Sequence, residues 1–264
     1  MEGMKRILSY VRRGIDDYGM IKEGNKIAVG VSAGKDSLAL LCAMAELRRF
    51  YPIPFELCAV TVDMGFEGMD LTPIKEFCET LGVEYHIVPT QISKIIFDVR
   101  KEKNPCSLCA KMRRGALYNH AKQLGCTSVA LGHHFDDVVE TFMLNLFFEG
   151  RLGCFQPVTY LSNTDITLIR PMIYMPEKDI RYFASKNVLP IIKSPCPADG
   201  NTEREDMKRL LHDLERENKG LRYRIFGAIQ RGEIDGFKVI GRMQGVKDYM
   251  DDSEDNSDNA MLYL

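Results

Sequence analysis

Short apolar segments alternate with stretches of helical length along this chain, and this alternation constrains its fold more than any other feature. The segments with the composition of buried strands cover 26–31, 56–62, 84–88, 128–132 and 167–171. The stretches with helical length or spacing cover 4–22, 37–50, 71–82 and 136–148. Strands that alternate with helices favour a parallel sheet with helices on both faces. The sequence therefore predicts an α/β fold with a doubly wound, mostly parallel sheet of about five strands.

The length of 264 residues suits one large domain or one domain with appendages. We expect a short helical extension over 1–24, a main domain over 25–220 and a C-terminal extension over 221–264. The stretch 251–264 is acidic and low in complexity, so we expect a disordered tail there. Ligands bind beyond the carboxyl ends of the strands in such sheets. A site is therefore expected in the loops after the first, second and fourth strands.

The charge and hydropathy of the chain limit its partners. Charged residues make up 27% of the chain and the formal net charge is -2, which gives no global case for binding nucleic acid or membranes. A local basic patch is still compatible with these values. The N-terminus lacks an apolar signal core, and no apolar run has membrane-spanning length. We therefore expect a cytoplasmic protein without a membrane partner.

The eight cysteines do not indicate a disulfide framework, because cytoplasmic thiols are kept reduced. Cys42, Cys58, Cys78 and Cys126 lie in or beside apolar segments, and we interpret them as small core residues. Cys154 is assigned no role. The remaining three cysteines have neighbours that call for a separate interpretation.

A glycine loop, SAGKDS at 32–37, lies between the first expected strand and the helix after it. Small residues let backbone N–H groups approach an anion, and the helix N-terminus adds a favourable dipole. Lys35, Ser32 and Ser37 add donors, so the loop has the composition of a phosphate site. Asp36 separates Lys35 from Ser37, which excludes a Walker A loop and suggests a Mg²⁺-bridged phosphate. The alternative is an ordinary turn capped by serine and aspartate.

A second polar cluster, GHHFDDVVET at 132–141, follows the fourth expected strand. Asp136 and Asp137 would lie in the first turn of a helix, where negative charge is favoured. By itself the segment is equally compatible with two helix-terminal carboxylates and two solvated histidines. Because this loop and the glycine loop both follow parallel strands, we expect them to meet at one crevice.

Three cysteines are candidate metal ligands. Cys106 and Cys109 form a C-x-x-C pair in which a turn brings both thiolates to one side. Cys196 lies between two prolines, which indicates a rigid loop. A thioredoxin-type role would need the pair directly after a first strand, and a closed zinc site needs four ligands. From the residues alone, redox, zinc and structural roles stay open.

These motifs resemble a known family. SAGKDS is similar to the PP-loop of N-type ATP pyrophosphatases, usually written SGGxDS, with Ala33 in place of a glycine. GHHFDDVVET resembles the GHHxDDxxET stretch of tRNA-modifying members, above all the tRNA 2-thiocytidine synthetase family, with Phe135 where arginine is frequent. Arg170-Pro171 resembles a further motif of that family. The resemblance covers roughly 5–215.

The resemblance implies an adenine nucleotide alpha-hydrolase-like fold and a set of nucleotide contacts. The ATP-binding residues it implies are Val31, Ser32, Ala33, Gly34, Lys35, Asp36, Ser37, Asp63, Gly132, His133, Asp136 and Asp137. Asp36 would also act in catalysis and contact Mg²⁺. Cys106, Cys109 and Cys196 would hold a 4Fe–4S cluster with one iron free of protein ligands, and would be catalytic through it.

The implied activity is adenylation of a base carbonyl followed by replacement of its oxygen with sulfur, at C2 of a tRNA cytidine. The implied partners are tRNA and a sulfur donor such as a cysteine desulfurase, and a homodimer is allowed for. The basic residues near the cysteine pair are either an RNA contact or a solvated helix face; they are Lys94, Arg100, Lys101, Lys103, Lys111, Arg113 and Arg114.

Three other functions stay open. The first is an amine-ligating tRNA-modifying enzyme, which would not need the cysteines. The second is a PP-loop enzyme that acts on a small molecule or free base. The third is a sensor that binds nucleotide and cluster without catalysis. A thiouridine synthetase with two zinc knuckles is disfavoured, because the chain has no second C-x-x-C pair.

Overall fold

The computed structural model describes residues 1–100, 105–193, 195–197 and 203–239. Its centre is a six-stranded sheet with the order β3-β2-β1-β4-β6-β5. The strands are β1 (Lys26–Gly30), β2 (Glu56–Asp63), β3 (Glu84–Pro89), β4 (Ser128–Ala130), β5 (Val158–Leu161) and β6 (Ile166–Ile169). All neighbours pair in parallel except β5 with β6. The predicted doubly wound, mostly parallel α/β fold is confirmed; the tail at 251–264 lies outside the described residues.

Strand β5 was not expected from the sequence. It pairs antiparallel to β6 at the edge of the sheet, with Tyr160 opposite Thr167. All four of its residues are at least partly exposed, and Tyr160 is 62% exposed. An edge strand of this kind lacks the apolar run that marks a buried parallel strand, so sequence patterning does not reveal it.

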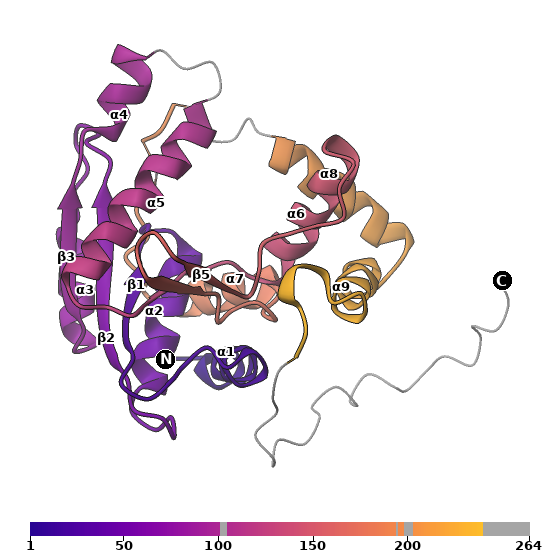
Figure 1. Cartoon of the computed structure of the whole chain (residues 1–264), viewed down its shortest axis with the longest axis horizontal. Helices are drawn as coiled ribbons and strands as arrows, with labels where there is room; N and C mark the ends of the chain where they lie inside the picture. The colour runs from indigo at the N-terminus through magenta and orange to yellow at the C-terminus, as the bar shows by residue number, and fades with distance from the viewer. Residues whose placement is uncertain (101–104, 194, 198–202, 240–264) are drawn as a thin grey trace, which may run out of the picture.

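Helices cover both faces of the sheet, as Figure 1 shows. The helices are α1 (Met4–Tyr18), α2 (Lys35–Leu47), α3 (Thr72–Thr80), α4 (Ile92–Lys94), α5 (Pro105–Gln123), α6 (Phe135–Phe148), α7 (Glu177–Lys186), α8 (Glu203–Glu217) and α9 (Leu221–Arg231), with a π-helix η1 (Ile95–Val99) and a 3-10 helix η2 (Ile234–Gly236). The larger apolar core joins α1, α2, α3, α6 and α7 to one face. The smaller core joins α5 and η1 to the other face.

The N-terminal helix belongs to the larger core. Ile7, Val11 and Ile15 of α1 are at most 1% exposed. The helix ends at Tyr18 rather than at 22, because Gly19 adopts a left-handed backbone with φ 56° and its N–H caps Ile15. The expected helices at 37–50, 71–82 and 136–148 are confirmed as α2, α3 and α6, each within a few residues.

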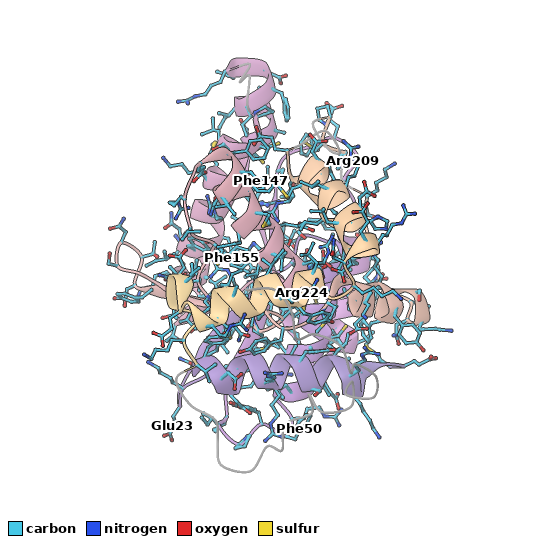
Figure 2. All side chains as sticks on the ribbon, turned by 90° about the vertical axis from the view of Figure 1, so that its right-hand side faces the viewer. Glu23, Phe50, Phe147, Phe155, Arg209 and Arg224 are labelled. Carbon is cyan, nitrogen blue, oxygen red and sulfur yellow. The ribbon has the colours of Figure 1, made fainter. Side chains whose placement is uncertain are left out.

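The C-terminal helices pack on the same side of the molecule as α1. Figure 2 shows α9, marked by Arg224, lying between α1 and α8, which carries Arg209. Phe226 of α9 contacts Tyr174 and Phe237 through edge-on rings. Ile229 of α9 is 0% exposed, so α9 is anchored in the larger core. Within the described residues, no helix has the length and apolar character needed to cross a membrane.

The strand order places two loops side by side. From β1 the chain crosses to β2 through α2 and on to β3, whereas β4 adds to the opposite edge of β1 after α5. The helices α2 and α5 lie on different faces of the sheet. The gap between β1 and β4 is therefore a topological switch point, where open α/β sheets bind ligands. The glycine loop follows β1 and the GHHFDD loop follows β4 at this point.

Candidate active site

The glycine loop closes on itself at the end of β1. Ser32 N–H and Ser32 Oγ both approach Ser37 Oγ, at 3.1 and 3.2 Å. Ser37 Oγ lies 3.0 Å from the carbonyl oxygen of Gly34, to which it donates. Helix α2 begins at Lys35 with no side-chain cap on its N-terminus. Its first N–H groups are therefore open to an anion, which helix N-termini attract.

Ala33 adopts the left-handed backbone that the loop requires. Its φ is 62°, in a region that residues with a Cβ rarely adopt, and its side chain is 0% exposed. Related loops with glycine here would avoid this strain. The carbonyl oxygen of Ala33 accepts a 3.1 Å hydrogen bond from Ile192 N–H, which fixes the loop to the segment that leads to Cys196. Packing around the buried Ala33 and its hydrogen bond with Ile192 therefore keep the loop in this strained conformation.

The two loops touch at Gly132. A Cβ at this position would lie 3.1 Å from the carbonyl carbon of Asp36 and 3.2 Å from the nitrogen of Ser37. Contacts that short are tighter than most Cβ contacts, so a side chain here would push the backbone of Asp36 and Ser37 away by a few tenths of an ångström. The expected meeting of the two motifs is confirmed by this contact.

Of the two histidines of the second loop, His134 is buried and His133 is half-buried. His134 is 5% exposed, and its backbone N–H donates to Asp137 Oδ2 at 2.9 Å, which begins α6 with a capping box. Burial, together with the positive charge of Arg170, lowers the pKa of His133 to about 4. The His133 ring packs 4.8 Å from the ring of Phe155. His133 is therefore neutral near pH 7.

Lys35 links the glycine loop to α7. Its ammonium lies 2.9 Å from Asp36 Oδ1 and 3.1 Å from Glu177 Oε1. Burial opposes the charge of Lys35, but Asp36 and Glu177 raise its pKa above the usual value. Burial alone would raise the pKa of Glu177, but Lys208 and Lys35 lower it to about 2. Lys35 is thus held cationic beside the loop that would bind phosphate.

The carboxylates of α6 face basic residues that the sequence interpretation missed. Arg222 Nη1 lies 2.9 Å from Asp136 Oδ1, and Arg204 Nη1 lies 3.1 Å from Asp137 Oδ1. Both arginines also approach Glu140, at 3.8 and 3.7 Å. Burial and the charge of Asp137 raise the pKa of Glu140 to about 7. Arg204 and Arg222 come from α8 and α9, and no local pattern links them to α6.

The other predicted nucleotide contacts lie at the same edge of the sheet. Val31 follows β1, is 3% exposed, and donates its N–H to Val60 at 2.9 Å. Asp63 is the last residue of β2, where its carboxylate accepts a 2.9 Å hydrogen bond from Gly65 N–H. Because β2 pairs with β1, Asp63 lies one strand away from the glycine loop. The ATP-binding roles assigned to these residues stay predictions.

The cysteine pair begins a helix rather than a turn. Cys106 and Cys109 lie in the first turn of α5, where residues three apart share a face. Burial raises the pKa of Cys109, Arg113 lowers it, and negative charge on Cys196 or Cys106 would raise it further. Cys106, Cys109, Cys196 and Arg113 therefore form one electrostatic neighbourhood.

Cys196 follows a segment that is hydrogen-bonded to the glycine loop. It lies four residues after Ile192, whose N–H is hydrogen-bonded to Ala33, so the Cα atom of Cys196 is within about 14 Å of the Cα atom of Ile192. It lies outside helices and strands, as its flanking prolines predicted. Within the described ranges, no three histidine, cysteine or acidic side chains already stand in metal-binding geometry. Three thiols in one neighbourhood are nevertheless a donor set that suits an iron–sulfur cluster.

Comparison with known proteins gives the family. The PP-loop domain family ATP_bind_3 matches residues 6–215, which is most of the chain. The chain belongs to this PP-loop family. The match ends before Arg222, so α9 and its contact with Asp136 are outside the part that defines the family.

Relatives of this PP-loop protein include named tRNA-modifying enzymes. A tRNA-cytidine(32) 2-sulfurtransferase of Geobacter sulfurreducens is 40% identical over 85% of this chain and 89% of its own length. One of Citrifermentans bemidjiense is 41% identical over 81% of this chain and 85% of its own length. Among solved structures, the U34-tRNA thiolase NcsA from Methanococcus maripaludis, with its 4Fe–4S cluster, aligns with a TM-score of 0.71 and 29% identity. That alignment covers 87% of this chain and 78% of the other.

Phe135, which departs from the family pattern, and Cys154, which was assigned no role, both have structural explanations in this PP-loop protein. Phe135 is 4% exposed, and its ring lies 4.8 Å from Tyr223 and 4.9 Å from Phe226 of α9. Phe135 therefore forms part of the surface against which α9 packs. Cys154 donates its backbone N–H to Asp235 at 2.7 Å, and burial raises the pKa of its thiol to about 12. Its electrostatic neighbours are Asp235, Arg170 and Arg151 rather than the other cysteines.

The basic residues near the cysteine pair divide into two groups. Lys111, Arg113 and Arg114 are exposed on α5, beside the exposed Cys106. Lys94 and Arg100 are exposed around η1. Lys101 and Lys103 lie outside the described residues. The cysteine-bearing end of α5 thus carries a cluster of positive charge, which attracts a phosphate backbone.

Proposed function

We propose that this PP-loop protein is an ATP-dependent tRNA sulfurtransferase that replaces the C2 oxygen of a cytidine with sulfur. The observation that carries the proposal is the meeting of the loops after β1 and β4 at Gly132 and Asp36, with the segment before Cys196 bonded to Ala33. The glycine loop and the segment that leads to Cys196 thereby lie at one end of the sheet, which supports the proposal. The relatives named for cytidine 32 match over most of both chains, which favours cytidine over uridine.

The first step would be adenylation of the base. The C2 carbonyl oxygen attacks the α-phosphorus of ATP, a C–O–P bond forms, and pyrophosphate leaves. The open N–H groups at the start of α2 and the cationic Lys35 would stabilise the charge of the leaving pyrophosphate. Asp36 is the residue we assign to Mg²⁺, which favours carboxylate and phosphate oxygens. Asp136 and Asp137 would accept hydrogen bonds or bind the metal once Arg204 and Arg222 release them.

The second step would exchange oxygen for sulfur. Adenylation turns the carbonyl oxygen into a good leaving group, so sulfide can add at C2 and AMP then departs with that oxygen. Cys106, Cys109 and Cys196 would hold a 4Fe–4S cluster, which would supply a binding place for sulfide. A donor such as a cysteine desulfurase would deliver persulfide sulfur, and a thiol reductant would reduce it to the sulfide level. Arg113 would favour anionic sulfur near Cys109. Closeness of the two reacting groups supplies much of the rate.

The tRNA would approach along the cysteine-bearing end of α5. Lys111, Arg113 and Arg114 are exposed there and would contact phosphates, since this kind of contact dominates nucleic-acid affinity. Such contacts orient the substrate but do not select its base. Base selection would fall to the crevice between the two loops.

The two half-reactions can be separated by two substitutions. Lys35→Ala should reduce AMP formation by at least about 100-fold, because a donor to the leaving pyrophosphate is lost. Cys106→Ala should retain tRNA-dependent AMP formation but abolish thiolated nucleosides measured by mass spectrometry. Lys178→Ala is a matched control, since Lys178 is an exposed neighbour of Glu177. Iron and sulfide analysis of anaerobically purified protein should show a cluster in wild type and its loss in Cys106→Ala.

Other outcomes would favour the alternative functions. A Cys106→Ala variant with full modification activity would favour an amine-ligating enzyme. AMP formation with a free base but not with tRNA would favour a small-molecule substrate. Absence of AMP formation with any RNA would favour a sensor. A colourless protein that binds zinc at the three cysteines would overturn the cluster assignment.

A further inference from the structure

A pair of buried thiols lies at the other end of the sheet, and the proposed reaction does not use it. The Sγ atoms of Cys58 and Cys126 are 3.6 Å apart. The two residues are 0% and 2% exposed. Cys58 lies in β2, whereas Cys126 lies in the turn between α5 and β4, 68 positions later in the chain. A disulfide bond of about 2.05 Å would need the sulfurs to approach by only about 1.5 Å.

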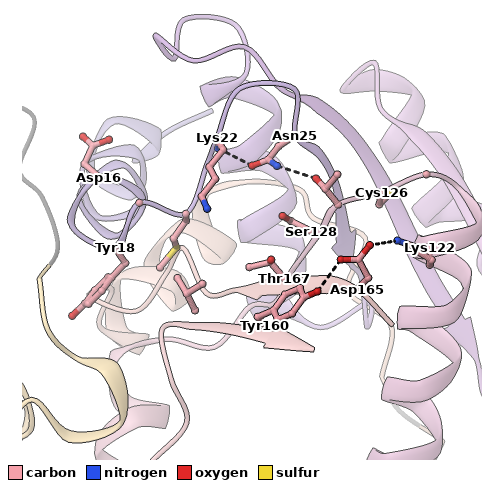
Figure 3. A pocket seen from close by; sticks show the side chains of 15 residues that line it. Asp16, Tyr18, Lys22, Asn25, Lys122, Cys126, Ser128, Tyr160, Asp165 and Thr167 are labelled. Carbon is pink, nitrogen blue, oxygen red and sulfur yellow. Dashed lines mark hydrogen bonds and ion pairs between the residues drawn. The ribbon is translucent and has the colours of Figure 1, made fainter. Parts of the chain in front are cut away.

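A cavity lies beside one of these two cysteines. It has a volume of about 770 Å³ and includes Cys126 in its lining. Figure 3 shows Cys126 at this cavity together with Lys122, Asn25 and Ser128. Ser128 is the first residue of β4, so the cavity opens at the amino ends of the strands. A small oxidant could therefore meet Cys126 without passing through the candidate active site.

The contact between the thiols gives them different acidities. The contact between the two sulfurs, in which either thiol can donate, lowers the pKa of Cys126 and raises that of Cys58. Burial opposes ionisation of Cys126, Lys26 favours it, and Glu56 and Glu84 oppose it. Cys126 is thus the more readily ionised thiol, and it is also the one at the cavity. Because a thiolate is the reactive form, Cys126 would react first and Cys58 would resolve the product.

We propose that Cys58 and Cys126 form an oxidisable dithiol that a peroxide converts to an intramolecular disulfide. The Cys126 thiolate attacks one peroxide oxygen, the O–O bond breaks, and the sulfur becomes a sulfenic acid as one water leaves. The Cys58 sulfur then attacks the Cys126 sulfur and displaces a second water. Two thiols are oxidised and one hydrogen peroxide is reduced to two waters. Cytoplasmic disulfides of this kind are usually transient and redox-sensing.

The disulfide would pin the end of α5 to the sheet. Cys126 N–H donates to the carbonyl oxygen of Ala121 in α5 at 2.9 Å, so a bond from Cys126 to β2 restrains that helix. The other end of α5 carries Cys106 and Cys109. The modification therefore acts on the element that positions the cysteine pair, from the end remote from the nucleotide.

The test is peptide mapping of the full-length protein after oxidation. Reduced protein is treated with one to a few equivalents of hydrogen peroxide, alkylated under denaturing conditions and digested with trypsin. Cys58 and Cys126 fall in tryptic peptides 50–75 and 123–151, each with a single cysteine. We expect these two peptides to be recovered as a linked pair, about 2 Da below the sum of their masses. Dithiothreitol should separate them.

Cys42 and Cys78 serve as internal controls, since both are buried and neither has a sulfur contact of this kind within the described residues. They should stay free while the pair is linked. The oxidised wild type should also melt at a higher temperature than the reduced protein, and Cys58→Ala should lose this shift. Recovery of Cys58 and Cys126 as free thiols after Cys106 and Cys109 have been oxidised would overturn the proposal. So would indiscriminate linkage of Cys126 to other cysteines.

Discussion

Arg222 Nη1 lies 2.9 Å from Asp136 Oδ1, which joins α9 to the first turn of α6 across 86 positions of sequence. The side chains of both residues are only 14% exposed. The same arginine lies 3.8 Å from Glu140 Oε1. Asp136 also accepts a 2.7 Å hydrogen bond from Glu177 N–H, so its carboxylate connects α6, α7 and α9. The C-terminal helix is therefore part of the electrostatics of the candidate site.

Arg222→Ala should destabilise the protein and loosen α9. Two partly buried carboxylates, Asp136 and Glu140, would lose a counter-charge, so the free energy of unfolding should fall by about 2–3 kcal/mol. Urea unfolding measures this change. Arg231→Ala, at the exposed end of the same helix, should change it by less than about 0.5 kcal/mol. Equal losses in the two variants would contradict the importance of the Asp136 contact.

Ala33→Gly should be nearly neutral for stability. Relief of the positive φ should raise the free energy of unfolding by about 1 kcal/mol. Loss of the buried methyl group should lower it by about 0.8 kcal/mol. Ala39→Gly is the matched control, because Ala39 is equally buried inside α2 and has no strain to relieve. Ala39→Gly should lower the free energy of unfolding by about 1 kcal/mol or more. Thermal unfolding compares the two; an equal loss would show that Ala33 is not strained.

Glu140→Gln should change how stability depends on pH. The folded pKa of Glu140, about 7, lies above its ordinary value of 4.5. The folded protein therefore binds more protons between these values, and this group's stabilising contribution is present below pH 4.5 and lost as pH rises through 7. The full effect is on the order of 3 kcal/mol. Glu140→Gln should remove this fall between pH 5 and 8 in urea unfolding.

Glu149→Gln is the control for that experiment, since Glu149 follows the same helix but its side chain is 60% exposed. It should leave the pH profile as in wild type. If Glu140→Gln also keeps the wild-type profile, another group carries the pH dependence.

Phe135→Arg should disrupt the packing of α9 against α6. The substitution places a charge where the rings of Tyr223 and Phe226 pack, so we expect a loss of more than about 3 kcal/mol. Phe135→Leu keeps an apolar side chain and should lose less than about 2 kcal/mol. Limited proteolysis would show whether α9 is released. Tolerance of arginine at this position would mean that α9 is held mainly by Arg222.

Sequence patterning was enough to predict the fold class and the meeting of the two loops. Alternating apolar and helical segments predict a parallel sheet, and motifs after two of its strands must then meet at one edge. The contact of Gly132 with Asp36 agrees with this expectation. The positive φ of Ala33 could also be anticipated, because glycine is usual at that position of the loop.

The distant residues that complete this edge could not be predicted from sequence patterns. Arg204, Arg222 and Glu177 lie on helices whose local patterns say nothing about α6 or Lys35. Cys58 and Cys126 each look like ordinary core residues until the fold brings their sulfurs together. Periodicity and motif spacing report the local backbone and which side of an element is buried. Pairing between remote side chains depends on how the helices pack, and that is set by the whole core at once.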